Sequence, residues 1–199
     1  MRHPAFPTHA SATQRRRNGF TLIEVLIVLV IVSTLLTLSV PRLNLSRFKD
    51  DGAVQVLRST LQLAQRAALT QQHDVLVSFD TSRQQMRVVL DINNDDKFSP
   101  GIGERATFRP MPDGARFKRP PTGVNGPVTG SITGGTVRLV DQMPTVVFHR
   151  DGAASGNTEI YFQGKAGAQS DFRAIVLTQA TGRSDWFRYN GSKWSAGGF

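Results

Sequence analysis

A nearly uninterrupted apolar stretch of 21 residues, from Phe20 to Val40, constrains this chain more than any other feature. Fifteen of its residues are large aliphatic or aromatic types. As a helix with a rise of about 1.5 Å per residue it would be about 31 Å long, enough to cross the hydrocarbon core of a bilayer. Because such a helix is apolar on all sides, it needs lipid or other helices around it. We therefore expect residues 20–41 to form a transmembrane and helix-packing segment.

The flanks of the apolar stretch separate two membrane interpretations. A secretory signal has a shorter apolar region, of about 7–15 residues, and small residues at a cleavage site; here Pro41 and Arg42 follow instead. A permanent anchor fits the length better. Three arginines at residues 15–17 precede the apolar stretch. Because basic flanks stay cytoplasmic, we expect the remainder of the chain to be exported.

Glu24 is a carboxylate inside the apolar stretch, where an ionisable group is costly and marks a functional position. One alternative is that Glu24 lies solvated among lipid headgroups. The other alternative needs a cation. If the chain were cut between Gly19 and Phe20, the new α-amino group would lie about one helical turn from Glu24. In an assembly this amine would pair with Glu24 of a neighbouring copy, and such a buried ion pair would set the axial register.

Residues 15–25, Arg-Arg-Arg-Asn-Gly-Phe-Thr-Leu-Ile-Glu-Val, closely resemble the class III signal of type IV pilins and type II secretion pseudopilins. The resemblance implies that a prepilin peptidase removes a leader of residues 1–19, cutting after Gly19, and N-methylates Phe20. It implies an assembly role for Glu24, with other pilins or pseudopilins of a filament as partners. It also implies a single-pass protein of the inner membrane in a Gram-negative-type envelope, with its head in the periplasm.

An amphipathic segment follows the apolar stretch. Its apolar residues recur at helical spacing and are Val54, Leu57, Leu61, Ala64 and Ala68. We predict a long helix from about Phe20 to about Gln72, kinked or interrupted at Pro41. Residues 42–72 would then be an amphipathic stem, whose apolar stripe needs a sheet to cover it.

Residues 73–199 carry alternating apolar and polar runs separated by turn residues, and we predict a β-rich head there. The seven predicted strands are 75–79, 86–90, 136–140, 145–148, 158–162, 173–177 and 186–189. Glycine and proline gather between residues 99 and 135, where we expect an irregular surface loop. A helix followed only by strands predicts the α+β class, with the helix packed on an antiparallel β-sheet. The pilin resemblance implies the same arrangement.

Two segments of the head resemble the GspH/FimT family of minor pseudopilins and minor pilins. They run from Phe148 to Gly156 and from Ile175 to Arg183. The resemblance implies a minor pseudopilin of type II protein secretion, a structural subunit of an inner-membrane-anchored pseudopilus that helps to export folded proteins. Two alternatives stay open. One is a FimT-type minor type IV pilin for pilus biogenesis and DNA uptake; the other is a membrane-anchored periplasmic binding domain that never polymerises.

Basic residues near the carboxy terminus are the candidate nucleic-acid contacts. DNA-binding pilins of the FimT type carry a Gly-Arg-x-Arg motif, and residues 182–185 match only its first arginine, Arg183. Asp185 stands where the second arginine belongs, and an acid there repels phosphate. Arg188 and Lys193, with aromatic residues between them, remain candidates for a platform that stacks single-stranded bases. The alternative is a sheet edge with a solvated charged face.

The segment 91–97 begins like a calcium loop, with oxygen ligands at alternating positions. Asp91, Asn93 and Asp95 are therefore candidate calcium ligands. The loop pattern then fails, because Asp96 replaces the required glycine and Ile102 stands where the bidentate glutamate belongs. The alternative is an Asx-rich turn that follows a strand.

The charge and composition limit the function classes. The net charge of +9 includes four arginines of residues 1–19, so without them 20 basic residues face 15 acidic ones, a charge of +5. The absence of cysteine excludes disulfides, thiol catalysis and Cys-ligated metals. Beyond the leader, His73 and His149 are the remaining histidines. We therefore expect a structural protein that is not an enzyme and needs no cofactor.

Overall fold

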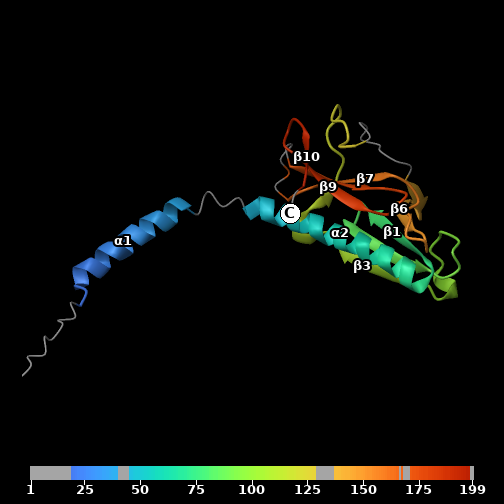
Figure 1. Ribbon diagram of the computed structural model, residues 1–199, viewed down its shortest axis with the longest axis horizontal. Coiled ribbons are helices and arrows are strands. Elements are labelled where there is room, and N and C mark those ends of the chain that lie inside the picture. The colour runs from blue at the N-terminus through green and yellow to red at the C-terminus, as the bar shows by residue number, and fades with distance from the viewer. Residues whose placement is uncertain (1–18, 40–44, 129–136, 166, 168–170, 198–199) are drawn as a thin grey trace, which may run out of the picture. The chain divides into compact units, whose positions relative to one another are not determined.

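The computed structural model describes residues 19–39, 45–128, 137–165, 167 and 171–197 (Figure 1). The side chains of residues 37–39 and 45–48 are outside that description. The chain divides into two compact units, residues 1–44 and residues 45–199. The first unit contains helix α1, and the second contains helix α2 and the strands.

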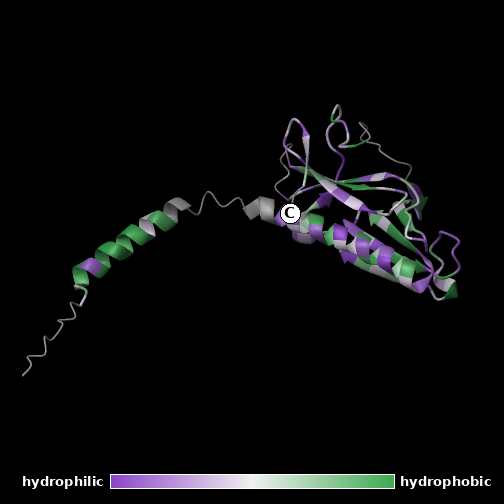
Figure 2. Cartoon of the chain, viewed as in Figure 1, coloured by the Kyte–Doolittle hydropathy of each residue, from purple (hydrophilic) through white to green (hydrophobic). Residues whose placement is uncertain are grey.

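Helix α1 spans Leu22–Ser39. It begins after Thr21, whose hydroxyl accepts a hydrogen bond from the Glu24 backbone N–H at 3.3 Å, which satisfies one of the free N–H groups at a helix start. Figure 2 shows the apolar colour along α1, interrupted by a polar patch near its beginning. Among the described residues, no helix combines the length and the apolar character that a membrane span requires. The predicted kink at Pro41 falls in residues 40–44, outside the described residues.

Helix α2 spans Leu45–Gln71 and has two unlike faces (Figure 2). The predicted apolar stripe is confirmed, because each of its residues is at most 2% exposed. These residues are Val54, Leu57, Leu61, Ala64 and Ala68. The helix ends where Gln72 adopts the left-handed conformation, with φ of 58°, a common way for a helix to stop.

The first antiparallel sheet has the strand order β3-β2-β1-β6-β5. Its strands are β1 (Asp74–Asp80), β2 (Gln85–Asp91), β3 (Ala106–Pro110), β5 (Arg138–Val140) and β6 (Met143–Phe148). Strand β1 lies in the middle, where Val77 faces Val88 of β2 on one side and Val146 of β6 on the other. The hairpin between β1 and β2 closes around Asp80, whose carboxylate accepts hydrogen bonds from the N–H groups of Ser82 and Arg83.

The second antiparallel sheet has the strand order β10-β9-β8-β7-β4. Its strands are β4 (Arg116–Phe117), β7 (Thr158–Gln163), β8 (Phe172–Leu177), β9 (Ser184–Tyr189) and β10 (Trp194–Ala196). The seven predicted strands all overlap observed ones, and the α+β class with antiparallel pairing is confirmed. The strands divide into two sheets rather than one, because pairing between distant segments is not written in local sequence periodicity.

The range 99–135 differs from the expected irregular loop. It contains strands β3 and β4 and two short 3₁₀ helices, Pro100–Ile102 and Pro112–Gly114. Strand β3 is an edge strand, and most of its side chains are exposed. An edge strand without a buried face lacks the alternation by which strands are predicted. Strand β10, also at an edge, was missed as well.

The main hydrophobic core lies where α2 meets the two sheets. Helix α2 contacts β1 and β6 of the first sheet and β8 and β9 of the second (Figure 1). A smaller apolar cluster covers the other face of the first sheet and comprises Leu76, Val89, Val140 and Val147, with Phe98 against them. The side chain of Gln65 on α2 donates to the carbonyls of Gly152 and Thr181, each at 2.7 Å. One amide therefore joins the helix to two separate turns.

Candidate functional site

The predicted processing and assembly residues lie at the start of α1. Gly19 and Phe20 precede the helix in open surroundings: Phe20 is 80% exposed, and a side chain at Gly19 would contact nothing within 4 Å. Glu24 lies in the first turn of α1. The structure thus leaves Gly19 accessible, as a cleavage position requires. Cleavage, methylation and pairing of Glu24 stay predictions.

The large apolar side chains of α1 from Leu22 to Leu36 are between 44% and 84% exposed. They surround the helix on all sides, so no single face marks the position of a partner. Within the described residues, these side chains take part in neither hydrophobic core cluster. An apolar helix of this kind is stable where lipid or other helices surround it.

The candidate calcium ligands lie in a loop that is closed by its own hydrogen bonds. Asp91 is fully buried, and its carboxylate accepts hydrogen bonds from the N–H groups of Asp95 at 3.2 Å and Asp96 at 2.6 Å. Burial raises the pKa of Asp91, although these hydrogen bonds act in the opposite direction. Asn93 donates to the Asp95 carboxylate at 3.0 Å. These contacts are those of the alternative, an Asx-rich turn, and calcium binding at these residues stays a prediction.

Glu104 closes the same loop from its far end, which the sequence interpretation missed. Its carboxylate accepts hydrogen bonds from the N–H of Ile92 at 3.0 Å and of Ser99 at 2.6 Å. Glu104 is only 4% exposed. The acidic residue that ends the loop was visible in the sequence, but its distance along the chain did not fit a calcium loop.

The candidate nucleic-acid contacts do not form one open platform. Arg183 donates twice to Asp185, from Nε at 3.1 Å and from Nη2 at 2.9 Å. Arg188 lies on β9, and Lys193 precedes β10 in a turn held by the Asn190 side chain. Of the neighbouring aromatic residues, Trp186 and Tyr189 are buried and Trp194 is half-buried.

Trp194 illustrates this packing. Its indole N–H donates to the Asn125 carbonyl at 2.6 Å, and its ring lies 5.2 Å from that of Tyr189 and 5.9 Å from that of Tyr161. Trp186 is buried. The rings of Trp194 and the two tyrosines thus contact one another, and nucleic-acid binding by Arg183, Arg188 and Lys193 stays a prediction.

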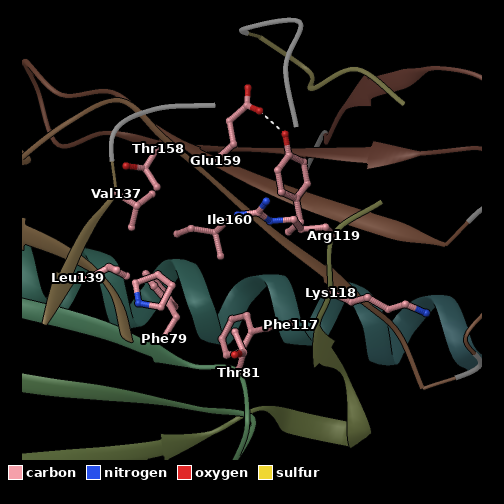
Figure 3. A pocket seen from close by; sticks show the side chains of 12 residues that line it. Phe79, Thr81, Phe117, Lys118, Arg119, Val137, Leu139, Thr158, Glu159 and Ile160 are labelled. Carbon is pink, nitrogen blue, oxygen red and sulfur yellow. Dashed lines mark hydrogen bonds between the residues drawn. The ribbon is translucent and has the colours of Figure 1, made fainter. Parts of the chain in front are cut away.

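A cavity of about 350 Å³ opens between the two sheets (Figure 3). Its apolar walls include Phe79 of β1, Phe117 of β4 and Ile160 of β7. The rings of Phe79 and Phe117 meet edge to face, with centroids 5.6 Å apart. Polar groups gather away from these walls, where the Tyr161 hydroxyl donates to the Glu159 carboxylate (dashed line in Figure 3).

Two cations, Lys118 and Arg119, line the cavity. Arg119 acts electrostatically on the Tyr161 hydroxyl, whereas the Lys118 amine points away from the polar pair (Figure 3) and donates to the Gln163 side chain at 3.1 Å. Burial and the Glu159 carboxylate raise the pKa of Tyr161, so its hydroxyl keeps the proton that it donates. The arrangement has apolar walls and a charged rim, which suits contact with another protein surface better than acid–base catalysis. The sequence offered no signal for it, because the cavity is lined by residues of five strands that only the folded sheets bring together.

A buried ionic cluster lies at the beginning of the head and was also missed. Arg173 of β8 is fully buried, and its guanidinium donates to Asp171 at 2.7 Å and to Asp51 of α2 at 3.2 Å. Asp50 is 3% exposed. Burial and a hydrogen bond with Asp171 raise the pKa of Asp50 to about 7. The Asp50 carboxyl therefore holds a proton below about pH 7.

In Asp171 the opposing influences on the pKa result in a net lowering. Burial acts to raise its pKa, but the hydrogen bond with Asp50 and the Arg173 guanidinium together lower it below the ordinary value. A pair of neighbouring carboxyl groups commonly titrates in this split way. The cluster joins the first turns of α2 to the second sheet, so it is a structural contact with a titratable component.

Comparison with known proteins identifies the class of this chain and then its family. A profile of the prokaryotic N-terminal methylation motif matches residues 14–40, which defines a pilin-like protein. A profile described as type II transport protein GspH matches residues 53–182. The chain belongs to this GspH family, and the resemblance seen in residues 15–25 and in the head is confirmed.

One solved structure is similar at low identity. It is the minor pseudopilin EpsH from the type 2 secretion system of Vibrio cholerae, with 9% sequence identity and a TM-score of 0.46. The match covers 70% of this chain and 97% of the EpsH chain. No curated protein matches the chain.

Proposed function

We propose that this chain is a minor pseudopilin of a type II secretion system, a structural subunit of the pseudopilus. Residues 20–41 anchor it in the inner membrane, and residues 45–199 form a head in the periplasm. A prepilin peptidase removes residues 1–19 and methylates Phe20. The observation that carries the proposal is the combination of a methylation motif at 14–40 with a GspH head at 53–182.

The exposed apolar surface of α1 supports an assembly role. A helix whose apolar residues are exposed on all sides gains stability only when lipid or other helices cover it. Other subunits of the filament supply such helices. Glu24 then pairs with the methylated amine of a neighbouring subunit, which offsets the cost of a carboxylate in apolar surroundings.

The head supplies specificity for neighbouring subunits. Its core is covered by α2 and the two sheets, and the cavity beside Phe117 and Ile160 leaves an apolar surface with a charged rim. In this proposal the function is mechanical: the head keeps its contacts with neighbouring subunits while the filament grows. Catalysis is not required of any residue.

The test is deletion of the gene, followed by measurement of the native secreted proteins in the medium and of DNA uptake in the same strain. Lost secretion with normal uptake supports the pseudopilin. Normal secretion contradicts it. Complementation with Glu24→Leu separates a filament subunit from a simple anchor, because an anchor tolerates the change and a subunit fails to restore secretion. Thr34→Leu, which replaces another polar residue of α1, is the matched control and restores secretion.

A second candidate function, a minor pilin for DNA uptake, is favoured by one observation. A polar hollow of about 420 Å³ lies between α2 and the turn at 181–185, and Arg58, Arg66 and Arg183 line it. Arg58 also donates to the Ser184 carbonyl at 3.2 Å. Three guanidinium groups opposed by Asp185 attract a phosphate. Lost uptake with normal secretion in the deletion strain would favour this function over the first.

A further inference from the structure

Three metal-ligating side chains from distant parts of the sequence meet at one end of the first sheet. Asp74 begins β1, His149 follows β6, and Asp96 lies in the loop after β2. One ligand atom from each lies within 4.8 Å of the other two. We infer that Asp74, Asp96 and His149 form a binding site for a divalent first-row transition metal, with zinc as its simplest occupant.

The sheet fixes the backbone at this site. Val75 pairs with Phe148, so Asp74 and His149 lie next to each other at the end of the β1–β6 ladder. Asp74 also pairs with Asp91, where β2 ends and the loop with Asp96 begins. Because these positions belong to paired strands and their first loop residues, the ligands do not have to be gathered from a flexible region.

The distances suit a metal of this kind. Nδ1 of His149 lies 2.7 Å from Oδ2 of Asp74. Around a tetrahedral zinc with bonds of about 2.0–2.2 Å, neighbouring ligand atoms are about 3.3–3.6 Å apart. To bind the metal, these two atoms would therefore have to move apart by less than 1 Å, roughly the difference between those values. One imidazole nitrogen with two carboxylates is a donor set that zinc and related metals accept.

Supporting hydrogen bonds already orient the carboxylates. The second oxygen of Asp74 accepts the Arg150 N–H at 3.1 Å, and the Asp74 N–H is held by Asn94 at 2.8 Å. The Asp96 N–H donates to Asp91 at 2.6 Å. Such outer contacts orient metal ligands and tune their affinity. They come from the chain itself and leave Oδ2 of Asp74 directed at His149.

Charge favours a cation here. The Asp74 side chain is 10% exposed and that of His149 is 38% exposed, so the site is partly screened from water but open to entry. Buried Asp91 lies beside it. Arg138 pairs with Asp96 and is the cation that a metal would have to share or displace. Arg138 therefore weakens binding in this proposal.

The experiment is calorimetric titration of the full-length chain in detergent with zinc chloride, without a histidine tag. His3 and His9 are changed to Gln in every sample, so that leader histidines do not contribute. The expected result is saturable binding of one zinc per chain. Asp74→Asn and His149→Gln each weaken it by about tenfold or more, as expected when a ligand is lost.

One further variant distinguishes a metal site from an ion-pair network. Arg138→Gln removes the competing cation, so it tightens zinc binding. If Arg138 and the three proposed ligands form only ion pairs, the Arg138→Gln variant does not bind zinc, and the proposal is overturned. Asp96→Asn, in a surface loop, replaces Asp74→Asn should that variant fail to fold. His73→Gln and Asp113→Asn remove groups outside the cluster and leave binding unchanged.

Cobalt gives a readout that a structural effect does not reproduce. Co²⁺ bound by the three side chains shows visible absorption bands typical of a low-coordinate site, and these bands disappear in His149→Gln while far-ultraviolet circular dichroism stays the same. Absence of saturable binding by zinc or cobalt, or equal binding by wild type and His149→Gln, would show that the cluster is not a metal site.

Discussion

Helices α1 and α2 follow one another in the chain but use their apolar residues in opposite ways. In α2 a stripe of apolar side chains is buried against two sheets, and Leu57 is fully covered. In α1 the apolar side chains surround the helix and stay largely exposed, Leu29 by 61%. The contrast shows that α2 buries its apolar residues within its own unit, whereas α1 does not bury its apolar residues within its own unit. The second unit therefore has a hydrophobic core of its own, and α1 needs lipid or other helices to cover its apolar surface.

The largest expected effect is the loss of packing under α2. Leu57→Ala leaves a cavity in the core and lowers the free energy of unfolding by about 2–5 kcal/mol. Leu29→Ala, the same change in α1, should alter it by less than about 0.5 kcal/mol, because this side chain is largely exposed and belongs to neither hydrophobic core cluster of the described residues. Urea denaturation followed by circular dichroism measures both. An equal loss in both variants would show that α1 packs on the head.

The second effect is a pH dependence confined to the beginning of α2. The pKa of Asp50 is raised from 3.8 to about 7 in the folded chain. The folded state holds this proton, so the stabilisation is complete below about pH 4 and is lost as the pH rises to about 7. We expect a fall on the order of 1–2 kcal/mol over this range, smaller than the Asp50 shift alone implies because Asp171 shifts in the opposite direction.

Asp50→Asn tests this pH dependence. The amide keeps a neutral side chain at every pH, so the fall in the free energy of unfolding between pH 4.5 and 7.5 should become smaller; a part due to Asp91, whose pKa is also raised, remains. Asp51→Asn, at a more exposed neighbour of Arg173, is the control and retains the slope. A slope in Asp50→Asn as steep as in the wild type would assign the proton to another group.

The third effect concerns the turn at residues 181–182, which is joined to α2 by the hydrogen bond from Gln65 to the Thr181 carbonyl. Gly182 has φ of +61°, and a Cβ there would lie 2.3 Å from the Gln65 side chain and 2.4 Å from the Gly152 carbonyl. Gly182→Ala should lower stability by about 1–2 kcal/mol from the left-handed conformation alone, and crowding adds to this. Gly101→Ala meets nothing within 4 Å and should be neutral. Thermal unfolding of the two variants compares them.

The smallest effect is expected at the surface. Arg183 and Asp185 form an ion pair whose side chains are 73% and 44% exposed. Asp185→Asn should change stability by about 0–1 kcal/mol, because exposed ion pairs contribute little. If the hollow beside Arg183 binds DNA, the same change should tighten binding in a filter or anisotropy assay. Unchanged DNA affinity would leave the pseudopilin proposal unopposed at this site.

The sequence predicted the parts of the fold that depend on local periodicity. The stripe of α2 was predicted from spacing, and seven strands from alternation. The edge strands β3 and β10 were missed because exposed edges need no alternating pattern. The division into two sheets was missed because it depends on pairing between distant strands, which a local pattern does not specify.

The candidate sites show the same limit. Gly19, Phe20 and Glu24 were assigned roles because a contiguous motif carries them, and those roles stay predictions. Arg173 was not identified from the sequence, because an arginine in a predicted strand is ordinarily assigned to the solvent face. In the structure it is fully buried. The meeting of Asp74 and His149 depends on strand register across 75 residues of sequence, which no spacing rule indicates.

The amide of Gln65 has a consequence for how the head comes apart. It binds a carbonyl from the turn between β6 and β7 and another from the turn between β8 and β9. A sheet that detached from the helix would lose its hydrogen bond to this amide and would uncover the core that it shares with α2 and the other sheet. Loss of either layer therefore exposes the core of both, and the head should unfold in a single cooperative transition.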